Sequence, residues 1–337
     1  MSGSAFQTLP FNLQDLLKDC HKGALQLPDF QRSWVWDEER IKGLIASVSR
    51  AFPMGALMTL NTGGAVNFKP RPVEGAPDAA KGQTPQALLL DGQQRMTSLY
   101  QVLLRGQVVQ TVTPKNKKVQ RWFYIDIRKA LDPAVDRDEA IVGVPADKVV
   151  REDFGRKPVL DLSSADKEYA ALMYPVGQVF DAYDWKQGFD RHWGSTAQAG
   201  EMRELFDAFR EEVLKSFMYY QVPVIALAQS TSKEAVCVVF EKVNTGGKPL
   251  DAFELVTAMY AADGHELRKD WYGSAEHSGR HARLQQALRP AGQDAGILAN
   301  VSNTDFLHIV SLFHTRERRR AAEQAGKQGK ELPAVTH

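Results

Sequence analysis

The sequence predicts an α+β protein, in which a small mixed sheet is surrounded by many helices. Two runs rich in β-forming residues, 119–127 and 217–227, indicate strands. Other segments place apolar residues at i, i+3, i+4 and i+7, which is typical of helices that bury one face. The two kinds of segment alternate irregularly, helices dominate, and no internal repeat is present. This pattern favours segregated helices and strands over a regular β-α-β succession.

The bulk composition is that of a soluble globular protein. The 337 residues are 43% hydrophobic and 25% charged, which is enough for one large domain or two ordinary ones. The net charge of +1 gives no sign of a polyanion partner, so any nucleic-acid surface must be local. Cys20 and Cys237 lie too far apart in sequence to indicate a disulfide framework or a zinc site.

No targeting or membrane segment is expected. The first twelve residues, MSGSAFQTLPFN, lack the basic and then apolar pattern of a signal peptide. No run of about 18 apolar residues is present, so no membrane span is predicted. These observations indicate a cytoplasmic protein without a membrane partner.

The first hundred residues are predicted to alternate short strands with capped helices. Asn12 and Asp37 each precede apolar residues at helical spacing and can cap those helices. Strands are expected at 24–27, 56–60 and 87–90. The intervening residues 61–86 contain many Gly and Pro and form a long loop, of a length that is often mobile or functional.

The rest of the chain gives weaker signals. The basic turn KNKK at 115–118 precedes the strand at 119–127, either as a solvated hairpin tip or as a phosphate patch. Residues 130–200 are expected to be mostly helix and irregular loop. The chain after about 265 is helical and polar, which divides the protein into a domain at 1–265 and a helical extension at 266–337. The extension could be the start of a missing or separate effector domain.

The stretch LLLDGQQRMTSLY at 88–100 is the strongest candidate site. A buried strand ends in Asp91-Gly92-Gln93-Gln94-Arg95 directly before a helix, where free amides and the helix dipole attract anions. Gly92 permits a tight turn, Arg95 can bind a phosphate through two hydrogen bonds, and the glutamines suit ribose, base or an attacking water. Asp91 could hold Mg²⁺, orient Arg95 or a water, or simply cap the helix.

Two further polar stretches could contribute to a site. Gln31 and Arg32 are flanked by Phe30 and Trp34, which are either core aromatics or stacking partners for a DNA base. A turn between two helices is either a helix C-cap or a phosphate cradle. Its residues are Asn244, Thr245, Gly246, Gly247 and Lys248.

Three blocks of the sequence together resemble the GmrSD-type restriction-system N-terminal domain, within the wider ParB/sulfiredoxin-like group. The blocks are LPDFQRSWVWDEERIKGLIASV at 27–48, DGQQR at 91–95 and VFEKVNTGGKPLDAFEL at 239–255. The resemblance implies a ParB/sulfiredoxin-like fold that binds and hydrolyses a nucleoside triphosphate, ATP or GTP, with Mg²⁺. It places this activity in the DGQQR loop. We expect catalysis by Asp91, Gln93, Gln94 and Arg95, and, from the chemistry of their side chains and backbone, nucleotide binding by Gly92, Gln31, Arg32 and the 244–248 turn.

The same resemblance implies service in anti-phage defence against foreign or modified DNA. Family members commonly carry an HNH-type nuclease domain, but the eight histidines here form no His-Asn-His set. The nuclease is therefore expected on a partner or on a missing segment, and a homodimer is also left open. The alternatives are a non-catalytic nucleotide- or DNA-binding module and a sulfiredoxin-like phosphotransferase, which would need a reactive cysteine.

The first two blocks are predicted to share one pocket. Pro28 ends the strand at 24–27, so Gln31 and Arg32 lie in extended chain before the helix that Asp37 caps. Two arginines, Arg32 and Arg95, would suit a triphosphate. Alternatively, Arg32 forms a structural pair with Glu38 or Glu39.

Overall fold

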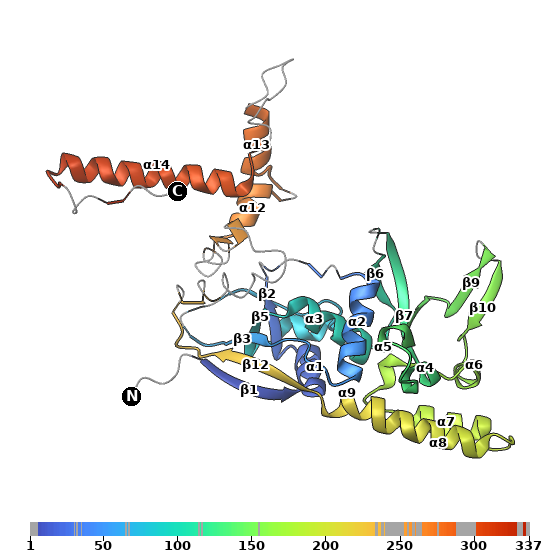
Figure 1. Ribbon diagram of the computed structural model, residues 1–337. Helices are drawn as coiled ribbons and strands as arrows, with labels where there is room; N and C mark the ends of the chain where they lie inside the picture. The colour runs from blue at the N-terminus through green and yellow to red at the C-terminus, as the bar shows by residue number, and fades with distance from the viewer. Residues whose placement is uncertain are drawn as a thin grey trace. The chain divides into compact units, whose positions relative to one another are not determined.

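The computed structural model confirms the α+β class, with several sheets and many helices (Figure 1). It describes residues 6–29, 31, 33–34, 36–64, 66, 68–113, 115, 117–153, 156–232, 235–236, 239, 253–254, 256–257, 260, 265–274, 276–287, 301–328 and 333–334. The likeness to a ParB/sulfiredoxin fold stays a prediction.

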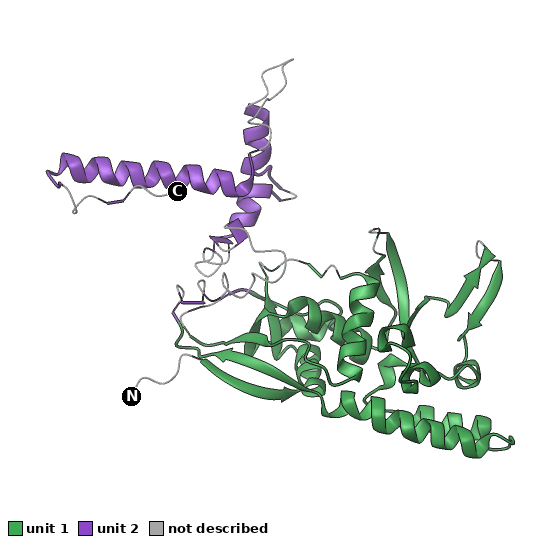
Figure 2. Ribbon diagram, in the orientation of Figure 1, with its two compact units in different colours: residues 1–65, 70–231 green, residues 66–69, 232–337 purple. Residues whose placement is uncertain are grey.

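The chain divides into two compact units (Figure 2). Unit 1 comprises Met1–Ala65 and Pro70–Thr231, and unit 2 comprises Val66–Lys69 and Ser232–His337. The domain division that the sequence suggests, at residue 265, stays a prediction.

A six-stranded mixed sheet forms the centre of unit 1. Its strands, in spatial order, are β1 (Phe6–Asn12), β12 (Gln221–Leu227), β3 (Leu57–Asn61), β5 (Ala87–Asp91), β2 (Leu25–Pro28) and β4 (Pro70–Arg71). The pairs β12–β3 and β2–β5 are parallel, and the other pairs are antiparallel. The predicted strands near 24–27, 56–60 and 87–90 are therefore confirmed. The exposed strand β1 and the two-residue strand β4 were not predicted, since neither shows alternating burial.

The helices of the first hundred residues begin where the sequence predicts. Asn12 accepts a hydrogen bond from the Gln14 amide at the start of α1 (Leu13–Lys22), and Asp37 accepts one from Arg40 at the start of α2 (Glu38–Ser49). Helix α3 (Gln93–Leu99) continues into the π-helical segment η2 (Tyr100–Leu104). These helices bury their apolar faces in one core with the sheet.

Residues 130–200 are mostly helix and irregular loop, as predicted, but they also contain four short strands that were not predicted. Two of these strands belong to a second, four-stranded sheet. It contains β6 (Val109–Val112), β7 (Lys118–Asp126), β8 (Ile141–Pro145) and β11 (Met173–Pro175), and β9 (Val149–Glu152) pairs with β10 (Lys157–Asp161). The four strands β8 to β11 were missed because they have only three to five residues each, too few to show a clear two-residue period. Between them lie α4 (Ile127–Leu131), α5 (Arg137–Ala140) and α6 (Ala165–Ala170).

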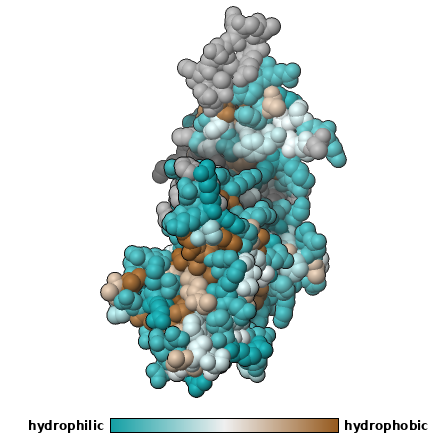
Figure 3. Space-filling model, turned by 90° about the vertical axis from the view of Figure 1, so that its right-hand side faces the viewer, coloured by the Kyte–Doolittle hydropathy of each residue, from teal (hydrophilic) through white to brown (hydrophobic). Residues whose placement is uncertain are grey.

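Helices complete unit 1 and lead the chain back into the central sheet. They are α7 (Tyr183–Trp193), α8 (Ala199–Phe209), the π-helical η5 (Arg210–Leu214) and α9 (Lys215–Tyr219). The strand predicted from residue 217 begins only at Gln221, because Phe217 points into the core as part of α9. The face of unit 1 shown in Figure 3 is mostly hydrophilic, with a patch of hydrophobic side chains near its middle.

Unit 2 is helical in its described residues. It contains α12 (Leu267–Tyr272), α13 (Arg280–Ala287) and α14 (Asn303–Gln324), and a capping box of Ser302 and Asp305 starts α14. Helix α14 has no buried residue over its 22 positions. None of the helices described in either unit is long and apolar enough to cross a membrane.

Candidate functional site

The β5–α3 junction, Asp91 to Arg95, joins the central sheet to a helix as the sequence predicts. Gly92 adopts a φ of 90°, in the left-handed region, and it is the N-terminal cap residue of α3. A Cβ at Gly92 would lie 2.2 Å from Cδ2 of Leu57, so a larger residue would meet both backbone strain and a clash. Because glycine has no side chain, no side-chain oxygen caps this helix.

Arg95 is bound within the protein rather than extended into solvent. Its Nη2 donates to Oδ2 of Asp91 at 3.0 Å, and its Nη1 donates to the carbonyl oxygen of Met54 at 2.8 Å. The Arg95 and Asp91 side chains are 20% and 27% exposed, so the ion pair is partly shielded from water. The guanidinium therefore fixes the junction to the chain segment before β3.

That segment, residues 52–55, is held from a second side by Tyr220. The Tyr220 hydroxyl accepts from the Met54 amide at 3.0 Å and donates to the Phe52 carbonyl at 2.6 Å. Burial raises the pKa of the Tyr220 phenol, while the Met54 amide and the charge of Arg95 act in the opposite direction. The phenol therefore stays neutral and can donate.

Gln31 lies beside the junction, on the edge where β2 has ended. Its Nε2 donates to the carbonyl oxygens of Leu89 and Leu90, both at 2.9 Å, just before Asp91. The residue is 6% exposed, and its Oε1 is buried without a hydrogen-bond partner. Among the described residues, this oxygen is an acceptor available to a ligand.

Helix α3 connects to the loop after β2 through two hydrogen bonds, and a third within the helix positions Ser98 for one of them. Gln94 Nε2 donates to the Ser33 carbonyl at 3.2 Å, and Ser98 Oγ donates to the Gln94 carbonyl at 2.8 Å. The indole Nε1 of Trp34 then donates to Ser98 Oγ at 2.9 Å. Gln93 and Gln94 are each 8% exposed, so both lie in the wall of the site rather than on the open surface.

Arg71 and Glu74, which the sequence analysis did not single out, complete this wall. Glu74 Oε1 accepts from Arg71 Nη1 at 2.9 Å and from the Trp34 amide at 3.1 Å, and Arg71 Nη2 donates to the Gln31 carbonyl at 3.2 Å. Within the described part of the chain, Glu74 Oε2 is buried without a hydrogen-bond partner. The only signal in the sequence was the length of the 61–86 loop, which carries both residues.

The structure brings together the predicted residues of two of the three blocks. Around the junction lie Gln31, Trp34, Asp91, Gly92, Gln93, Gln94 and Arg95. Phe30 and Arg32 lie outside the described residues, as do Asn244, Thr245, Gly246, Gly247 and Lys248. The predictions for these positions stay predictions.

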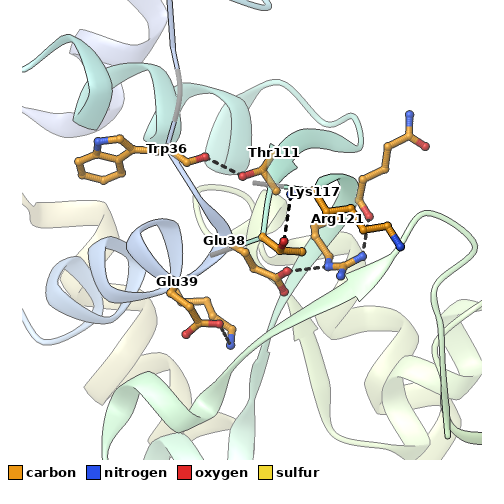
Figure 4. A network of polar contacts seen from close by, with 9 residues as sticks. Trp36, Glu38, Glu39, Thr111, Lys117 and Arg121 are labelled. Atoms are coloured by element: carbon orange, nitrogen blue, oxygen red, sulfur yellow. Dashed lines mark hydrogen bonds and ion pairs between the residues drawn. The ribbon is translucent and has the colours of Figure 1, made fainter. Parts of the chain in front are cut away.

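Glu38 and Glu39, the alternative partners for Arg32, have other basic partners. Glu38 Oε2 accepts from Arg121 Nε at 2.8 Å, and Glu39 Oε1 accepts from Lys42 Nζ at 3.0 Å. Figure 4 shows Glu38 and Arg121 pointing toward one another from α2 and β7.

The donor set at the junction is compatible with one nucleotide-bound magnesium ion. Asp91 supplies a single carboxylate, and Mg²⁺ is usually held by one or two carboxylates together with substrate phosphates. In the part of the chain that the structure describes, no group of three or more His, Cys, Asp or Glu side chains could hold a metal without a ligand. The junction therefore fits an ion that arrives with phosphate.

The buried thiol of Cys20 is unsuited to covalent chemistry. The residue is 0% exposed in the core, and burial raises its pKa to about 12. Cys237 lies outside the described residues. Cys20 therefore gives no support to the phosphotransferase alternative.

Comparison with known proteins shows similarity over most of the chain. The sequence model of the family described as GmrSD restriction endonuclease, N-terminal domain, matches residues 13–261. An uncharacterized protein of Methanocaldococcus jannaschii is 26% identical over 287 residues, which cover 79% of this chain and 44% of that protein. The chain thus spans less than half the length of this relative.

Proposed function

Because the chain belongs to the GmrSD restriction endonuclease N-terminal domain family, we propose that it binds and hydrolyses a nucleoside triphosphate as the sensor of its restriction system. Family membership supports a restriction-system component with a DNA substrate and a nuclease partner. The nucleotide, its hydrolysis and the sensing of foreign or modified DNA are the proposal.

The observation that carries the proposal is a pair of buried acceptors on two residues that hydrogen bonds link to the β5–α3 junction or to the loop beside it. Among the residues that the structure describes, Gln31 Oε1 and Glu74 Oε2 have no hydrogen-bond partner, although buried polar atoms in proteins nearly always have one. Both can only accept, so they suit the hydroxyl groups of a ribose or the amino group of a base. Phosphates, which are acceptors themselves, instead suit the amide end of α3 and the bare backbone of Gly92.

The other residues of the junction would bind Mg²⁺, orient water and contact phosphate. Asp91 would hold Mg²⁺, which supplies charge neutralisation at the phosphates when it is bound. Gln93 and Gln94 can each donate and accept, and so can orient an attacking water. Arg95 uses Nη1 and Nη2 inside the protein and keeps further N–H groups for a phosphate.

One observation favours the non-catalytic alternative. Arg95 is already paired with Asp91, and this pairing would have to persist or exchange during turnover. A protein that only clamps or senses a nucleotide needs no such exchange. The two functions differ in phosphate release and not in nucleotide affinity.

The test measures binding and turnover separately on the purified chain. Calorimetry gives the affinity for ATP, GTP, CTP and UTP with Mg²⁺, and phosphate release is followed with and without DNA. We expect Asp91→Asn to remove turnover, whereas Asp184→Asn, at an exposed carboxylate of α7 that makes no ion pair with a described residue, changes neither quantity.

Binding and phosphate release together distinguish the hydrolase from the nucleotide clamp. Nucleotide binding without phosphate release would support the clamp, and absence of binding for all four nucleotides would reject both functions. We also expect no nicking of plasmid by this chain with Mg²⁺ and nucleotide. Nicking that follows the protein through purification would contradict the expected separate nuclease.

A further inference from the structure

A cavity in unit 1 shares Trp34 with the wall of the β5–α3 junction but has its other walls elsewhere. Its volume is about 600 Å³, within the range of roughly 300–1,000 Å³ that is usual for ligand pockets. The walls come from the loop after β2, from the β6–β7 hairpin and from the end of β8. They include Trp34, Trp36, Gln110, Lys118, Gln120 and Arg121.

Hydrogen bonds hold the backbone of Trp36 and the indole of Trp34. The carbonyl oxygen of Trp36 accepts from Thr111 Oγ1 at 2.7 Å, and the next residue, Asp37, bridges to Val112 of β6 (Figure 4). The indole of Trp34 is tied to Ser98 of α3. Both side chains remain partly exposed, and both residues are part of the cavity wall.

The hairpin presents polar groups on one face. Gln110 pairs with Gln120 across the strands, and Val112 pairs with Lys118. Alternate residues of a strand lie on the same face, so Gln110, Gln120 and Lys118 share one side of the hairpin. An amide side chain can both donate and accept, as the edge of a nucleobase does.

The tip of the hairpin carries an excess of positive charge. Lys115, Lys117 and Lys118 are exposed, and none of them forms an ion pair with a described residue. Two hydrogen bonds link Thr113 and Lys117 across the hairpin: the Thr113 amide donates to the Lys117 carbonyl at 2.9 Å, and the Lys117 amide donates to Thr113 Oγ1 at 3.2 Å. Arg121 differs, since it is neutralised by Glu38.

We propose that this surface binds DNA, with an unpaired base in the tryptophan-lined cavity and the neighbouring phosphates on Lys115, Lys117 and Lys118. Aromatic side chains beside unpaired cations are the combination that holds single-stranded nucleic acid, because every base has a face to stack and every phosphate a charge to neutralise. The choice of DNA over other polyanions rests on the proposed function.

The test uses the full-length chain and fluorescein-labelled oligonucleotides, as a single strand and as its duplex, with anisotropy read at several salt concentrations. We expect the single strand to bind more tightly than the duplex. Replacing the three hairpin lysines by alanine weakens binding and lowers the salt slope by about 2, since each phosphate contact on a single strand contributes about 0.7. The matched control replaces Lys22, Lys129 and Lys157, exposed lysines of unit 1 that make no ion pair with a described residue.

The cavity itself is tested through Trp36. Stacking of a base on an aromatic ring contributes about 1–3 kcal/mol, so Trp36→Ala weakens single-strand binding by about 5- to 140-fold. Trp36→Phe keeps an aromatic face and restores most of the affinity, and the melting temperature of each variant shows whether it is folded. If folded Trp36→Ala binds as the wild type does, no base occupies the cavity.

The remaining outcomes separate this inference from the proposed function. Nucleotide affinity is measured on the same variants, and the hairpin substitutions leave it unchanged because they lie outside the junction. If the wild-type protein binds none of the nucleotides, the proposed function is rejected and the DNA surface is not. Equal effects of the hairpin and control lysines on DNA binding, or a preference for RNA of the same sequence, would reject the DNA surface alone.

Discussion

Arg95 of α3 and Asp91 at the end of β5 are four residues apart in sequence and close the β5–α3 junction through a 3.0 Å ion pair. The same guanidinium reaches the carbonyl oxygen of Met54, so one side chain joins the start of α3 to the segment before β3. A residue that the sequence assigns to phosphate binding is thus also part of the framework. The effect of a substitution at Arg95 must therefore be measured on both stability and activity.

We expect Arg95→Ala to lower the free energy of unfolding by about 1–3 kcal/mol, because Asp91 and the Met54 carbonyl each lose a partly buried donor. The same substitution should abolish phosphate release. Urea denaturation gives the first quantity and phosphate release the second. The control is Arg128→Ala, whose pair with Glu201 is more than half exposed and should change stability by less than about 1 kcal/mol. Wild-type turnover by folded Arg95→Ala would remove Arg95 from the mechanism.

Gly55 offers a way to move Arg95 without changing it. Gly55 has a φ of 90°, and a Cβ there would lie 2.4 Å from Nη1 of Arg95. We expect Gly55→Ala to displace the guanidinium from the Met54 carbonyl and to destabilise the fold by about 1–2 kcal/mol, the strain of a left-handed residue. Thermal unfolding and nucleotide affinity are the measurements.

The matched control for Gly55 is Gly43, inside helix α2. A Cβ at Gly43 meets only Oδ1 of Asp138, at 3.7 Å, and the backbone there is helical. Gly43→Ala should therefore stabilise the protein by about 0.5–1 kcal/mol. If both alanine variants melted as the wild type does, the close approach at Gly55 would not exist in solution.

The burial of Cys20 predicts an inert thiol. Its folded pKa is raised to about 12, above the value of about 8.5 expected in the unfolded chain. The stability that this group contributes is fully present below about pH 8.5 and is lost as the pH rises through about 12. We expect iodoacetamide at pH 8 to leave Cys20 unmodified in the native protein and to label it in urea, as mapped by peptide mass. Rapid labelling of native Cys20 would reopen the phosphotransferase alternative.

Local hydrogen bonds explain why the starts of the helices around the central sheet could be predicted. Asn12 and Asp37 cap helices through amides two or three residues away, and Gly92 forms its turn within the DGQQR stretch, so short windows of sequence contain these interactions. The placement of Gln31 beside the junction also followed from a local signal, the end of β2 at Pro28.

The parts that sequence reasoning missed depend on distant partners. Arg71 and Glu74 are held by hydrogen bonds to the backbone of Gln31 and Trp34, which lie forty residues earlier in the sequence. The partner of Glu38 is Arg121 on β7, which no periodicity within α2 could reveal. Such pairings are fixed by the packing of the whole unit and not by propensity.

Gln31 gives the sharpest test of the site, because its two ends have separate roles. Its Nε2 supports the carbonyls of Leu89 and Leu90, while Oε1 is the unpaired acceptor. Gln31→Met keeps the approximate shape and removes both functions, so we expect a loss of about 1–3 kcal/mol in the free energy of unfolding together with weaker nucleotide binding. Gln31→Glu should destabilise the fold more, since it sets a buried carboxylate against two carbonyl oxygens.

The control is Gln221→Met, at an exposed amide, which should change stability by less than about 0.5 kcal/mol. Calorimetric affinities and urea denaturation are compared across the four proteins. A Gln31→Met variant that loses stability and keeps full nucleotide affinity would show that Oε1 does not face the ligand, and the nucleoside would have to be sought elsewhere around the junction.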